Sequence, residues 1–130
     1  MRSCRAPFVA AAALLAGCAA VTTADGTRLS FGSDEFRAYV EQVFREQNKT
    51  ASELAFALDD ATAAGGAEPR ELAAAEDALL AACAGINELA TSRRDAQHLG
   101  LHRSAAAARG APECERATRA ARSALAARAR

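Results

Sequence analysis

Alanine dominates this chain and restricts what the chain can fold into. The 130 residues include 38 alanines, whereas residues 18–130 hold only 19 larger Val, Ile, Leu, Phe and Tyr side chains. Strand patterns are absent, because few β-branched residues alternate with polar ones. The length excludes barrels and doubly wound sheets. We therefore expect a small all-α domain whose alanine-faced helices approach closely but bury little apolar surface.

The first helix is predicted over residues 33–65. Ser33 suits an N-cap, two acidic residues follow it, and Gly65-Gly66 ends the segment. Asn48-Lys49-Thr50 allows a kink, because Thr50 can start a second capping box. Helical spacing is carried by Phe36, Val40, Val43, Phe44, Leu54 and Leu58.

Two further helical segments follow. Pro69 suits a first helical turn, and apolar spacing extends from there to about Gln97. The last segment begins after Gly100, is interrupted at residues 110–112, and resumes from about Glu113. Residues 33–130 are therefore expected to form an antiparallel bundle of about three helices.

Residues 18–32 are small and polar. Asp25-Gly26 is a turn signal between two short segments, which allows a tiny hairpin. We expect instead a short flexible tether.

The first 17 residues have the layout of an export signal. Two arginines precede an uninterrupted apolar run over residues 8–15, which is shorter than the about 20 residues that cross a bilayer. The run ends in Leu15-Ala16-Gly17-Cys18. This motif resembles the lipobox of bacterial lipoprotein precursors, in which small residues fit the signal peptidase and the cysteine takes the lipid.

The resemblance implies that residues 1–17 are removed and that Cys18 becomes the first residue, linked to diacylglycerol and usually N-acylated, commonly with palmitate. Two or three acyl chains hold a protein on a membrane stably where one does not. Ala19 stands where an Asp commonly retains Gram-negative lipoproteins at the inner membrane. In a Gram-negative host the resemblance thus favours the outer membrane, with the domain facing the periplasm.

The formal net charge of zero conceals two opposed halves. Residues 18–92 carry a net charge of −8 and residues 93–130 a net charge of +6. We expect the basic half to fold onto the acidic one. A nucleic-acid partner is not expected, because the basic half has no aromatic side chains for base stacking.

Cysteine usage predicts one disulfide. Cys4 leaves with the signal and Cys18 takes the lipid, so Cys83 and Cys114 remain in an oxidising compartment. A redox pair is the weaker interpretation, because neither cysteine sits in an activating motif.

The disulfide implies a register if the last two segments form a hairpin. Residues whose numbers sum to 197 would face each other, which places the turn at His98-Leu99. This register sets Glu88 opposite Arg109 and Asp95 opposite His102. It also brings Glu76 and Asp77 within about a turn of Arg119 and Arg122. The break at residues 110–112 can shift all of these pairs.

No catalytic, cofactor or metal site is predicted. His98 and His102 have helical i, i+4 spacing, but Gly100 lies between them and only Asp95 is near as a third ligand. A solvated turn is the better interpretation. No phosphate loop, nucleophile elbow or Cys-x-x-Cys motif occurs.

Most aromatic side chains are expected in the core. The chain's aromatic residues after the signal are Phe31, Phe36, Tyr39, Phe44 and Phe56. Tyr39 lies off the Phe36-Val40 stripe, where it could help meet a partner.

These observations favour a non-enzymatic small lipoprotein, held on the bilayer through the acyl chains of Cys18. Its helical domain would serve as a structural or accessory interaction module with a protein partner in the envelope. The alternative is a lipid-anchored binder or inhibitor of a periplasmic enzyme, toxin or cell-wall component. A metal or redox protein is a third hypothesis, which rests only on the histidines and the cysteine pair.

Overall fold

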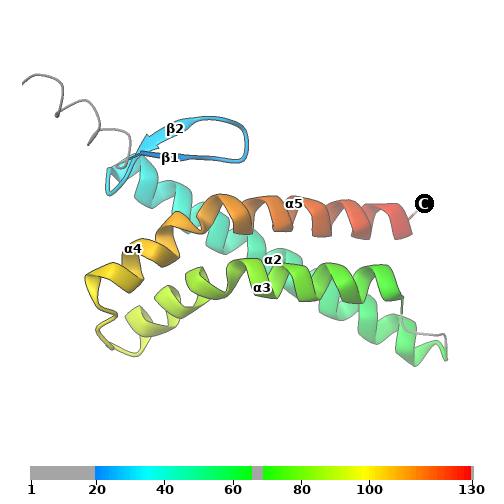
Figure 1. Cartoon of the computed structure of the whole chain (residues 1–130). Helices are drawn as coiled ribbons and strands as arrows, with labels where there is room; N and C mark the ends of the chain where they lie inside the picture. The colour runs from blue at the N-terminus through cyan, green and yellow to red at the C-terminus, as the bar shows by residue number, and fades with distance from the viewer. Residues whose placement is uncertain (1–19, 66–68, 130) are drawn as a thin grey trace, which may run out of the picture.

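A computed structural model describes residues 20–65 and 69–129, which form a helical bundle with a small two-stranded sheet beside it (Figure 1). The predicted signal segment and Cys18 lie outside the described residues. The elements follow one another as β1 (Ala20–Thr22), β2 (Arg28–Ser30), α2 (Asp34–Ala63), α3 (Arg70–Arg94), α4 (Leu101–Arg109) and α5 (Ala111–Arg128).

The longest helix, α2, begins where the capping signal predicts. The Ser33 hydroxyl accepts a 3.1 Å hydrogen bond from the Phe36 amide, and Asp34 and Glu35 occupy the first turn. The helix continues through Thr50, whose hydroxyl donates to the Glu46 carbonyl at 2.9 Å. The second capping box that we considered is therefore wrong. The buried face of α2 consists of Phe36, Val43, Gln47, Thr50, Leu54 and Leu58.

The other helices also follow their sequence signals. α3 ends at Arg94, slightly before the predicted end. Gly110 separates α4 from α5, and its amide donates to the carbonyl oxygens of Ala106 and Ala107. Pro112 stands in the first turn of α5, where a proline is tolerated because no helical donor is lost.

A disulfide between Cys83 and Cys114 joins α3 to α5 inside the core, as predicted. These two helices run antiparallel side by side, and α2 packs against both (Figure 1). The core cluster contains Val43, Leu54, Leu58, Leu72, Leu79, Cys83, Ile86, Ala111, Cys114 and Ala121. Phe56 is the exception among the aromatic residues that we expected in the core, since it is 75% exposed.

Small residues allow α3 and α4 to approach closely. A Cβ atom placed on Gly85 would lie 3.3 Å from the Cα atom of Ala107, which is tighter than ordinary van der Waals contact. Here the close packing that alanine-rich helices permit depends on a glycine.

The flexible tether predicted for residues 18–32 is wrong from Ala20 onward, because β1 and β2 form an antiparallel hairpin. Val21 pairs with Leu29 across the two strands, and Gly26 takes the positive φ of +91° that the turn requires. Val21 is buried against Phe36 in a second apolar cluster. Three-residue strands carry too little alternation to be recognised, and their stability depends on this contact with the bundle.

The predicted register fails at α4. Glu88 pairs with Arg103 instead of Arg109. The Arg109 guanidinium lies 5.0 Å from the centre of the Phe31 ring, in a cation–π contact. Asp95 pairs with its neighbour Arg94 rather than facing His102. The break at Gly110 changes the direction of the chain, so the spacing set by the disulfide does not extend into α4.

The basic C-terminal helix pairs with α2, not with α3 as predicted. Arg122 forms an ion pair with Glu46, and Arg128 lies 3.8 Å from Asp60. Within the described ranges, Arg119 pairs with Glu115 of its own helix. Each such surface pair is worth about 0–1 kcal/mol, so apolar packing and the disulfide determine the arrangement of the helices.

Candidate functional site

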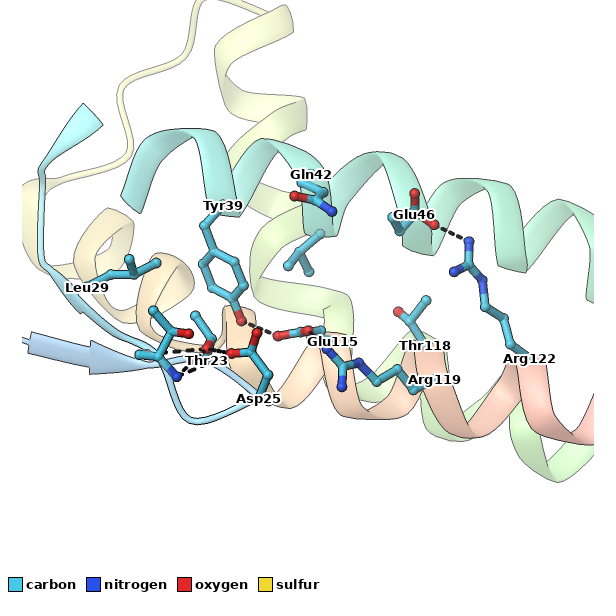
Figure 2. A pocket seen from close by; sticks show the side chains of 12 residues that line it. Thr23, Asp25, Leu29, Tyr39, Gln42, Glu46, Glu115, Thr118, Arg119 and Arg122 are labelled. Atoms are coloured by element: carbon cyan, nitrogen blue, oxygen red, sulfur yellow. Dashed lines mark hydrogen bonds and ion pairs between the residues drawn. The ribbon is translucent and has the colours of Figure 1, made fainter. Parts of the chain in front are cut away.

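A hollow of about 420 Å³ with a mainly polar lining lies between the hairpin, α2 and α5, and we call it the polar hollow (Figure 2). Threonine hydroxyls, carboxylates and two guanidinium groups dominate its lining. The lining residues are Thr23, Asp25, Thr27, Leu29, Tyr39, Gln42, Val43, Glu46, Glu115, Thr118, Arg119 and Arg122.

Glu115 of α5 is the central acceptor of this hollow. Its Oε2 atom accepts a 2.7 Å hydrogen bond from the Tyr39 hydroxyl and a 3.0 Å bond from the Ala24 amide. Arg119 binds the other carboxylate oxygen. One side chain thus connects α2, the hairpin and α5.

This environment keeps Glu115 ionised. Burial opposes ionisation, but the hydrogen bonds from Tyr39 and Ala24 and the Arg119 guanidinium together outweigh it, so the pKa of Glu115 lies below its ordinary value of 4.5. The pKa of Tyr39 is raised well above 10.0, first by burial and then by its hydrogen bond to the Glu115 carboxylate. A neutral tyrosine therefore donates to a charged carboxylate, which is a strong pairing.

The hairpin turn satisfies its own polar groups at the rim of the hollow. The Thr27 amide donates to Thr23 Oγ1 at 3.0 Å and to Asp25 Oδ1 at 3.2 Å. The Thr23 hydroxyl also donates to Asp25. This last bond, followed by the Thr27 amide, lowers the pKa of Asp25. These hydrogen bonds hold the hairpin turn in one conformation at the edge of the polar hollow.

At the other end of the polar hollow, Arg122 binds Glu46 and donates to Thr50 Oγ1 at 3.2 Å. The described carboxylates that line the hollow are thus all engaged with groups of the protein itself. The lining contains no His, Cys or Lys side chain that could act as a nucleophile or accept a proton near neutral pH. This arrangement holds the hairpin, α2 and α5 together.

A second hollow, of about 300 Å³, has mostly apolar walls and lies where the connection from β2 to α2 meets α2, α3 and α4. We call it the apolar groove. Its walls come from Phe31, Gly32, Phe36, Arg37, Val40, Glu41, Leu89, Arg93, Leu101, Ser104, Ala105 and Ala108. Leu101 stands at its edge and is 92% exposed, more than any other large apolar side chain in the described ranges.

The residues that the sequence analysis singled out do not come together in one site. Cys18 lies outside the described residues, and Cys83 and Cys114 lie in the core away from both hollows. His98 and His102 are exposed, and within residues 20–65 and 69–129 no cluster of three His, Cys, Asp or Glu side chains could hold a metal ion. Tyr39, considered as a partner contact, uses its hydroxyl to bind Glu115.

Sequence reasoning missed both hollows. The Asp25-Gly26 turn signal was the one clue to the polar hollow, because the hairpin forms its rim. Leu101, placed directly after Gly100 among polar residues, was the clue to the apolar groove.

None of the described helices contains a stretch long and apolar enough to cross a membrane. Comparison with family models, with curated proteins and with solved structures finds no match to this chain.

Proposed function

We propose that the chain is a bacterial lipoprotein, anchored through acyl chains on Cys18, whose helical domain acts as an accessory interaction module. The observation that carries this proposal is the motif Leu15-Ala16-Gly17-Cys18 after a short basic and apolar leader. In a Gram-negative host, Ala19 favours the periplasmic face of the outer membrane.

The position of the hairpin determines how close to the membrane an anchor at Cys18 would hold the domain. β1 begins at Ala20, two residues after this cysteine, and two residues of extended chain span at most about 7 Å. Anchoring would therefore hold the folded domain directly at the membrane surface.

An interaction role is favoured over catalysis by the two hollows. The carboxylates of the polar hollow bind groups of the protein itself, so a small charged ligand would have to displace these bonds. The apolar groove instead leaves Leu101 exposed at its edge. An apolar groove with an exposed leucine at its edge offers a contact surface to a large partner or a membrane.

Lipid attachment is tested by labelling growing cells with radioactive palmitate. The wild-type chain should incorporate label, and Cys18→Ala should remain an unprocessed precursor without label. Cys4→Ala is the matched control, since it removes another cysteine of the leader and should leave labelling unchanged. Label retained by Cys18→Ala would overturn the anchor.

The proposed location at the outer membrane is tested by separating the inner and outer membranes and measuring which fraction contains the protein. The wild type should fractionate with the outer membrane, and Ala19→Asp should shift the protein to the inner membrane. Ala19→Ser is the control that keeps a small residue without charge. An inner-membrane location of the wild type would contradict the outer-membrane assignment while leaving the anchor intact.

The accessory role is tested by crosslinking intact envelopes. A membrane protein recovered in stoichiometric amount with the wild type supports an accessory module. Recovery of one enzyme whose activity falls when the lipoprotein is added would instead support an inhibitor.

A further inference from the structure

One end of the bundle combines three features that the polar hollow does not explain. β1 begins there, and the turn between α3 and α4 lies there (Figure 1). The residues that line the apolar groove come from the start of α2, the end of α3 and α4, which meet at this end. The opposite end holds the last residues of α5 and the end of α2 (Figure 1).

The groove end presents an exposed apolar side chain near several basic ones. Leu101 is 92% exposed beside the apolar walls formed by Phe31 and Leu89. Residues 93–103 contain three arginines and one acidic residue, Asp95. Two of these arginines already have carboxylate partners, since Arg94 lies 2.9 Å from Asp95 and Arg103 pairs with Glu88. The groove lining itself contains one arginine of this segment, Arg93, together with Glu41 of α2. Exposed apolar surface with an arginine beside it suits the interface of a phospholipid bilayer, where a guanidinium group can meet headgroup phosphate.

Chain connectivity brings the proposed lipid site to the same end. Ala20 pairs with Ser30 at the open end of the hairpin, and the next two residues, Phe31 and Gly32, line the apolar groove. Cys18 precedes Ala20 by two residues, which keeps their Cα atoms within about 7 Å. A bilayer that holds the acyl chains therefore lies next to the groove.

We propose that the groove end is a membrane-docking surface, on which Leu101 inserts into the interface of a phospholipid bilayer and Arg93 contacts anionic headgroups. The inference rests on the proposed anchor at Cys18 and adds an orientation to it. Interfacial apolar side chains reach about 5–10 Å into the headgroup and acyl boundary. α2 and α5 then carry the opposite end of the bundle away from the membrane.

The chain offers an internal control for this orientation. Phe56 is also a large exposed apolar side chain, at 75% exposure, and it lies on α2 twenty residues after Phe36. At 1.5 Å per residue this places it about 30 Å along the helix from Phe36 and more than about 20 Å from Glu41, the last groove residue of α2. The sequence contains no tryptophan, so a single introduced tryptophan reports on one position alone.

The experiment uses the full processed protein reconstituted in vesicles that contain anionic phospholipid, with and without brominated acyl chains. Leu101→Trp should show a blue-shifted emission and a loss of intensity with brominated lipid. Phe56→Trp should emit as in water and keep its intensity. Both positions are mostly exposed, so neither substitution is expected to disturb the core.

Equal intensity of Leu101→Trp with and without brominated lipid overturns the docking surface. A blue shift that occurs without lipid and grows with protein concentration also overturns it, because a second copy of the chain would then cover the groove.

The intact mass of the same sample separates this inference from the proposed anchor. A lipidated mass with unquenched Leu101→Trp rejects the docking surface and leaves the anchor standing. If the mass shows no lipid, the anchor fails, and the vesicles are added to the unlipidated protein. If brominated lipid then quenches Leu101→Trp but not Phe56→Trp, the docking surface is supported without the anchor. If Leu101→Trp is not quenched, the docking surface is rejected together with the anchor.

Discussion

The Tyr39 hydroxyl donates a 2.7 Å hydrogen bond to Glu115 Oε2, which joins α2 to α5 across 76 positions of sequence. The same oxygen accepts the Ala24 amide of the hairpin at 3.0 Å. Three elements that are remote in sequence therefore depend on one carboxylate (Figure 2).

Removing the Tyr39 hydroxyl should weaken this connection. Tyr39→Phe keeps the ring in its half-buried position and deletes the donor, so the free energy of unfolding should fall by about 1–2 kcal/mol. Urea denaturation measures the loss. A double-mutant cycle with Glu115→Gln should give a coupling energy clearly different from zero, and additive effects would show that the two side chains do not act together.

Acid should destabilise the domain through Glu115. Its folded-state pKa lies below the ordinary 4.5, so its contribution is complete above that pH and disappears as the pH falls through the folded-state pKa. Glu115→Gln should flatten the dependence of stability on pH in this range. Glu53→Gln, on an exposed face of α2 4.0 Å from Lys49, is the control that should retain it. Identical acid profiles for both variants would contradict the role of Glu115.

Tyr39 can be titrated by itself because it is the single tyrosine of the chain. Its pKa is raised above 10.0 by burial and by the Glu115 carboxylate, so the stability that it contributes is complete below pH 10 and decreases as the pH rises toward the folded-state pKa. Tyrosinate absorbance should show ionisation at higher pH in the folded protein than in urea. Glu115→Gln should lower the pKa of Tyr39, and coincident curves for folded and unfolded chains would be inconsistent with this environment.

The disulfide should stabilise the domain substantially. Cys83 and Cys114 are 31 residues apart, and closing a loop of this length is worth about 3–4 kcal/mol on the entropic model. Cys83→Ala with Cys114→Ala should lower the denaturation midpoint accordingly. Both sulfur atoms are fully buried, so a mild reductant should open the bond at the rate of unfolding. Two thiols that titrate in native oxidised protein would rule out the bond.

Two neighbouring positions of α2 should respond in opposite ways to truncation. Leu54 is 0% exposed and Phe56 is 75% exposed. Leu54→Ala should cost about 2–5 kcal/mol through lost burial and a cavity, whereas Phe56→Ala should stay within about 0.5 kcal/mol. Thermal denaturation of the two variants compares them directly. A comparable loss in Phe56→Ala would mean that this aromatic side chain is covered in solution.

The helices of this protein were predictable because their signals are local. The Ser33 cap and the break at Gly110 each depend on residues within one turn of the position concerned. The pairing of Cys83 with Cys114 was also predictable, since two cysteines remained in the presumed oxidising compartment. Capping signals and the number of available cysteines can be read from the sequence without knowing which helices pack against each other.

The hairpin and the ion pairs were not predictable in the same way. β1 and β2 are short, and Val21 is buried by Phe36 and Ala108, which come from two different helices. Arg122 forms its ion pair with Glu46 of α2 and not with an acidic residue of α3. Exposed charges are abundant and each pair is weak, so charge segregation along the sequence could not specify the partners.

The sequence by itself determined a small helical domain, its helix boundaries within a few residues, the disulfide and the lipobox-like motif. These follow from alanine content, capping residues and spacing, which act over short distances along the chain. Only the tertiary structure decided that the hairpin is folded onto the bundle, that Tyr39 and Glu115 meet, and that Leu101 is exposed beside an apolar groove. Those features arise where three or more elements converge, and which elements converge depends on the packing of the whole bundle.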